Sequence, residues 1–93
     1  MITTSKLNDL IRVVDKSNEE EMEVTHIIQE AAEFIVELTK LDMGIDRPKK
    51  LKEEFSDLFF KQLKLLRFLG WTLDDLIYSC LCKTLEKFPH QLD

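Results

Sequence analysis

One stretch, IIQEAAEFIVEL at residues 27–38, constrains the fold most, because it carries acids into an otherwise apolar helical pattern. At about 100° per residue, the apolar side chains form one arc, and Glu30, Glu33 and Glu37 lie along one edge of it. The arc consists of Ile27, Ala31, Phe34, Ile35 and Leu38. Taken alone, these acids are most simply the solvated side of an amphipathic helix.

A second stretch, LKEEFSDL at residues 51–58, repeats this arrangement. Glu54 and Asp57 are again three residues apart and border a second apolar arc. Consecutive helices joined by a short connection usually pack antiparallel. If these two pack their apolar arcs together, four carboxylates from Glu30, Glu33, Glu54 and Asp57 meet along one seam.

Such a seam needs a counter-ion. Two carboxylates about 5 Å apart at an effective dielectric near 20 repel by roughly 3 kcal/mol. Oxygen ligands without cysteine or a dedicated histidine favour Mg²⁺, with Mn²⁺ as a substitute, over zinc. The two acid pairs therefore predict a Mg²⁺ site.

The remaining pattern predicts an all-α fold of four helices. Apolar spacing and capping residues place them at about 5–16, from Ser17 or Asn18 to about 41, at 48–69, and from Thr72 to about 88. The acids at 19–21 are interpreted as the first turn of the second helix, where the helix dipole favours negative charge. Gly44 and Gly70 are the expected stop signals.

Length and composition predict a single domain over residues 1–93. The chain is 44% hydrophobic and 33% charged, which is typical of a helical globular domain. No apolar run is long enough for a membrane span or signal peptide, so we expect a cytoplasmic protein that does not bind membranes. A net charge of −5 argues against general nucleic-acid binding. Cys80 and Cys82 are expected to be reduced thiols in or near the core.

Three lysines are candidates for binding an anion. Lys83 and Lys87 border the apolar face of the last helix, although lysines in a last turn also simply complement the helix dipole. Lys61 follows the second acid pair by one turn and is either a phosphate ligand or a solvated lysine.

The third helix has more aromatic surface than one seam can bury. Phe60 and Phe68 lie off its main arc, on different sides. We therefore expect a homodimer. The alternative is that the first helix folds over this surface.

These motifs resemble those of the MazG-type nucleoside triphosphate pyrophosphohydrolases, in the all-α NTP pyrophosphatase superfamily. The segment QEAAE at 29–33 resembles the family's EExxE, EEFSD at 53–57 resembles its EExxD, and KTLEKFPH at 83–90 is similar to its closing KxxxR-x-P-H. A GWTLDDL turn lies between the last two. Gln29 and Ser56 depart from the family's pattern but leave the four acid positions intact.

The resemblance implies a four-helix bundle-like core that forms a dimer or tetramer. It also implies Mg²⁺-dependent cleavage of a nucleoside triphosphate between its α and β phosphates. The metal ligands and catalytic residues would be Glu30, Glu33, Glu54 and Asp57. Lys83 and Lys87, with Lys61, would hold substrate phosphates.

Three alternatives stay open on the same scaffold. One is a phosphoribosyl-ATP pyrophosphohydrolase, and another is an enzyme specific for a deoxynucleotide. The third is a helical interaction module without catalytic activity.

Overall fold

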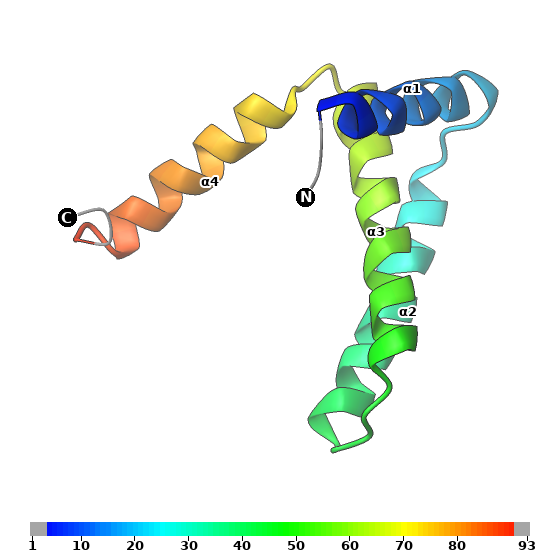
Figure 1. Ribbon diagram of the computed structural model, residues 1–93, viewed down its shortest axis with the longest axis vertical. Coiled ribbons are helices and arrows are strands. Elements are labelled where there is room, and N and C mark those ends of the chain that lie inside the picture. Colours follow the sequence, from blue (N-terminus) through cyan, green and yellow to red (C-terminus); the bar gives the residue numbers. More distant parts are fainter. Residues whose placement is uncertain (1–3, 91–93) are drawn as a thin grey trace.

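The fold is all-α, as the sequence predicts (Figure 1). A computed structural model describes residues 4–90 of the chain. This part contains helices but no strand. The helices are α1 (Thr4–Glu20), α2 (Val24–Asp42), α3 (Pro48–Phe68) and α4 (Leu73–Lys87).

Helices α2 and α3 form an antiparallel pair joined by a short connection (Figure 1). Gly44 ends α2 with a φ of +85°, a conformation that glycine adopts without steric cost. Pro48 then stands in the first turn of α3, where a missing N–H does no harm. Along the seam, the rings of Phe34 and Phe55 meet edge to face, with centroids 5.3 Å apart. This pair of helices carries both predicted acid motifs.

Helix α1 packs across one end of α3 (Figure 1) and is fixed there by polar contacts. The Asn18 side chain donates to the Lys64 carbonyl at 3.0 Å, and the Lys64 ammonium donates to the Glu21 carbonyl at 2.8 Å. Lys64 is 5% exposed. Because its ammonium donates to the Glu21 carbonyl, its charge lies at the C-terminal, negative end of the α1 dipole. Arg67 on α3 also forms an ion pair with Asp15 on α1.

The expected start of the second helix at Ser17 or Asn18 is wrong. Helix α1 continues to Glu20, and the break between the helices falls at residues 21–23. The acids at 19–21 therefore follow or end α1 and do not begin α2. The reason is tertiary: Asn18 uses its side chain to hold α3, and Lys64 supplies a cation to the carbonyl of Glu21.

Helix α4 extends away from the other three helices (Figure 1). Its predicted capping box is confirmed, since Thr72 Oγ1 accepts from the Asp75 N–H at 3.1 Å and the Asp75 side chain accepts from the Thr72 N–H at 2.9 Å. None of its side chains is buried. The expected placement of Cys80 and Cys82 in or near the core is therefore wrong, since both are exposed on this helix. Within one chain, the packed unit therefore has three helices, and the expected four-helix bundle-like core is not formed by this chain alone.

The core is correspondingly small. The buried apolar side chains within residues 4–90 are Val14, Leu63 and Leu66, where α1 meets α3. Phe60 is half-buried, whereas Phe68 stays 62% exposed. No helix in the described part of the chain is both long and apolar enough to cross a membrane.

Candidate metal centre

Three of the four predicted acids lie together on the α2–α3 seam. Glu30 and Glu33 come from α2 and Glu54 from α3, and one carboxylate oxygen of each lies within 4.8 Å of the others. We call these three residues the acid cluster. Asp57, the fourth predicted ligand, is exposed and lies outside this set, although its charge contributes to raising the pKa of Glu30.

Two oxygens of the acid cluster are buried without a hydrogen-bond partner, Glu30 Oε2 and Glu54 Oε2. Burial raises the pKa of Glu30 above its ordinary value, and the neighbouring charge of Glu33 raises it further. A buried acceptor with no donor costs free energy in a folded protein. The oxygen donors and the unmet negative charge therefore fit a hard divalent cation.

Lys50 supplies the positive charge nearest to this cluster. Its Nζ lies 2.9 Å from Glu54 Oε1, and the side chain of Glu54 is 7% exposed. This hydrogen bond lowers the pKa of the Glu54 carboxyl and raises the pKa of the Lys50 ammonium. Lys50 is not among the site residues predicted from the sequence, although its position one turn before Glu54 is a signal for such a pair.

A hollow of about 310 Å³ opens over the seam. It is lined by Glu33, Val36, Glu37, Lys50 and Glu54. Glu37 is buried and forms ion pairs with Lys40 at 3.3 Å and Arg47 at 3.5 Å. Glu37 therefore has two cations to itself, whereas the three carboxylates of the acid cluster have one ion pair among them within the described part of the chain, with Lys50.

The predicted phosphate-binding lysines are not brought to the cluster within one chain. Lys83 and Lys87 are exposed on α4, which extends away from the seam (Figure 1). Lys61 is half-buried on α3 and forms no ion pair with any residue of the described range. Helical spacing alone could not reveal the direction in which α4 leaves the turn.

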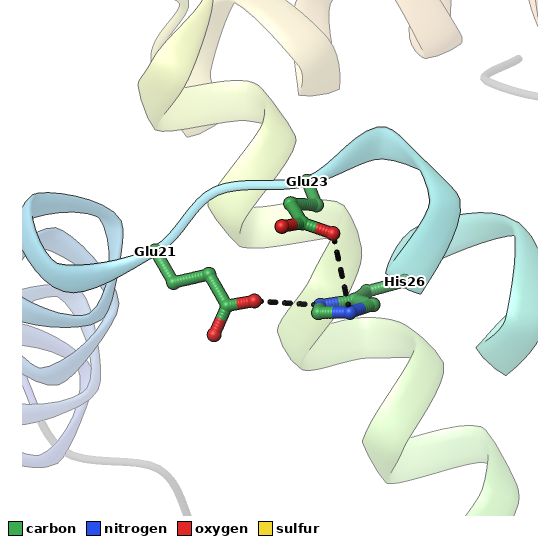
Figure 2. Close-up of side chains that lie close together, drawn as sticks. All are labelled: Glu21, Glu23 and His26. Atoms are coloured by element: carbon green, nitrogen blue, oxygen red, sulfur yellow. Dashed lines mark ion pairs between the residues drawn. The ribbon is translucent and has the colours of Figure 1, made fainter.

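A second group of possible ligands lies between α1 and α2 (Figure 2). The ring of His26 lies between two carboxylates, with Nδ1 3.6 Å from Glu21 and Nε2 3.4 Å from Glu23. The glutamate side chains are 57% and 55% exposed. Water can solvate them, so this group lacks the buried, unpartnered oxygens that distinguish the acid cluster.

Comparisons of this chain with protein-family models, with curated proteins and with solved structures find no match. The resemblance to MazG-type enzymes therefore depends on the three sequence motifs alone.

Proposed function

We propose that this chain is a MazG-type nucleoside triphosphate pyrophosphohydrolase. It would hydrolyse its substrate between the α and β phosphates to a nucleoside monophosphate and pyrophosphate, in the housekeeping of the cytoplasmic nucleotide pool. One observation carries the proposal: two helices bring three carboxylates together, and two of the oxygens are buried without partners.

Glu30, Glu33 and Glu54 would hold the metal, and Asp57 could join them from the next turn of α3. Mg²⁺ is the expected ion, with Mn²⁺ as a substitute, because all the ligands are carboxylates. A bound divalent cation would supply charge neutralisation for the triphosphate and an activated water for in-line attack on phosphorus. The hollow of about 310 Å³ leaves room for the cation and several of its waters.

The proton of the attacking water needs an acceptor. Glu37 already faces two cations, Lys40 and Arg47. A carboxylate of the acid cluster that is not fully committed to the metal could accept the proton instead. We therefore favour such a carboxylate over Glu37 for this role.

Phosphate binding by Lys83 and Lys87 would require a second copy of the chain. Ile77 on α4 is 62% exposed, Phe88 directly after this helix is 53% exposed, and Phe55 on α3 is 60% exposed. A homodimer or homotetramer would cover such surfaces and place α4 of one chain against α2 and α3 of another. Lys61 would then be a further candidate for a phosphate.

The other candidate functions differ in substrate or in activity. Phosphoribosyl-ATP and single deoxynucleotides would suit the same metal site. The exposed apolar face of α4 favours the remaining candidate, an inactive helical interaction module.

Pyrophosphate release from a panel of ribo- and deoxyribonucleoside triphosphates and phosphoribosyl-ATP, with and without Mg²⁺, tests the proposal. Glu54→Gln keeps the size of the side chain and removes its charge, and we expect it to lower the rate about a hundredfold or more. The adjacent, exposed Glu53→Gln is the matched control and should stay near the native rate. If the native protein releases no pyrophosphate from any substrate, the interaction module is the better account.

A further inference from the structure

Lys50 is the cation that forms an ion pair with the acid cluster, among all the residues that the structure describes. The contact joins its Nζ to Glu54 Oε1 at 2.9 Å. The two side chains differ in exposure, 43% for Lys50 and 7% for Glu54. A half-exposed ammonium therefore balances a carboxylate that is largely buried.

The helix itself does not favour a lysine at this position. Lys50 lies in the first turn of α3, where the helix dipole is unfavourable for a positive charge. A lysine four residues before a glutamate is also the weaker order of such pairs. The acids around Lys50 must therefore hold it in place: Glu54 by a hydrogen bond, and Glu53 and Glu37 by their charge.

The place that Lys50 occupies is also the place for a cation. Lys50 and Glu54 line the same hollow over the seam, together with Glu33 of the acid cluster. The ammonium 2.9 Å from Glu54 Oε1 occupies one side of this carboxylate, and Glu54 Oε2 stays without a hydrogen-bond partner among the residues that the structure describes. A metal ion on the same carboxylate would lie close to the ammonium, and the two positive charges would repel each other, so they compete for Glu54.

We propose that Lys50 is a tethered counter-ion that competes with the divalent cation for Glu54. In the metal-free protein it neutralises the buried carboxylate and stabilises the fold. When a divalent cation binds, Lys50 releases Glu54 and turns to solvent, which its exposure allows. This inference rests on the proposed metal site but not on catalysis.

The competition predicts the direction in which stability and metal affinity change when Lys50 is replaced. Removal of the lysine charge should lower the stability of the metal-free protein and raise its affinity for the cation. Replacing a surface lysine that has no role would change stability and cation affinity only by the small effect of altering the net charge by one. A lysine that helped to build the cation site would lower the affinity when removed.

The test is Mn²⁺ binding, measured by calorimetry and by the electron paramagnetic resonance signal of free Mn²⁺. Lys50→Gln is compared with Lys52→Gln, an exposed lysine on the same helix that undergoes the same change of charge. We expect Lys50→Gln to bind Mn²⁺ about tenfold more tightly than the native protein. Its melting temperature should be lower in EDTA and rise more on addition of Mn²⁺. Lys52→Gln should bind within about twofold of native.

A second variant covers the case in which Lys50→Gln folds poorly. Lys50→Arg keeps the charge and can hold a carboxylate through two hydrogen bonds, so we expect Mn²⁺ affinity about threefold below native. If the native protein binds Mn²⁺ and Lys50→Gln binds it equally well or more weakly, the proposed role of Lys50 is wrong. The proposed metal site would not be affected by that result. If the native protein binds no Mn²⁺, the metal site of the proposed function fails as well.

Discussion

A carboxylate oxygen of Glu30 and one of Glu54 lie within 4.8 Å of each other, although the two residues belong to different helices. Each residue also buries an oxygen that has no hydrogen-bond partner. Like charges in this position destabilise the protein unless a cation compensates them. The acid cluster is therefore a place where the chain gives up stability, which is typical of functional sites.

Removal of the Glu30 charge should stabilise the metal-free protein. Because the pKa of Glu30 is raised in the folded state, its contribution to stability is present below the unfolded pKa and is lost as the pH rises through the folded pKa. At pH 7 in EDTA we expect Glu30→Gln to melt roughly 3 °C above native. Mg²⁺ should then stabilise the native protein more than the variant.

The matched control for this variant is Glu53→Gln, which removes an exposed acid from α3. Thermal unfolding by circular dichroism checks both variants. Equal melting temperatures for Glu30→Gln and Glu53→Gln across pH 4–8 would show that repulsion among the carboxylates of the acid cluster does not lower the stability of the protein.

Lys64 should be a structural lysine rather than a functional one. Its buried ammonium donates to the Glu21 carbonyl and so ties the end of α1 to α3. Lys64→Met keeps the apolar stem but loses a charged hydrogen bond, and we expect the free energy of unfolding to fall by about 1.5–3 kcal/mol. Urea unfolding at pH 7 measures this change. An effect no larger than that of the exposed Lys52→Met would contradict this role.

The ion pair between Asp15 and Arg67 should make stability depend on pH. Arg67 donates to both carboxylate oxygens at 2.9 Å and lowers the pKa of Asp15. The pair therefore adds stability above the unfolded pKa of Asp15, about 3.9, and this stability is lost as the pH falls through the lower, folded pKa.

The variant Arg67→Gln tests this dependence. At pH 7 we expect its melting temperature to be roughly 2–5 °C below native, with the difference shrinking below about pH 4. Arg12→Gln is the control, because Arg12 pairs with Asp9 within α1 and does not join two helices. A difference that stays constant from pH 7 to pH 3 would refute the assignment.

The exposed face of α4 should hold copies of the chain together. Ile77 is 62% exposed on this face, and helical spacing places Ser79 on the opposite side. Light scattering after size-exclusion chromatography should find the native protein as a dimer or tetramer and Ile77→Glu as a smaller species. Ser79→Glu adds the same charge and should leave the assembly intact. A native monomer at about 100 μM would contradict this prediction.

The sequence predicts those parts of the fold that depend on local contacts. Gly70, with a φ of +76°, follows α3 as expected, and Thr72 and Asp75 form the predicted capping box of α4. Acids three residues apart, such as Glu30 and Glu33, also fall on one helix face as predicted, because the spacing is a property of the helix.

Features that depend on distant contacts could not be predicted in this way. The break between α1 and α2 depends on Lys64, which lies 43 positions from Glu21 in the sequence. Helix α4 leaves the turn around Trp71 in a direction that the apolar spacing of the helix does not specify (Figure 1). The pairing of Lys50 with Glu54 was accessible from their spacing, but its importance follows only from the burial of Glu54.

The proposed function depends on the binding of a divalent cation by Glu30, Glu33 and Glu54. The anomalous scattering of Mn²⁺ in a crystal of the native protein measures this binding directly. We predict a peak about 2.0–2.3 Å from an oxygen of each of these glutamates. A peak only at Glu21, Glu23 and His26, or no peak on the α2–α3 seam, would contradict the account.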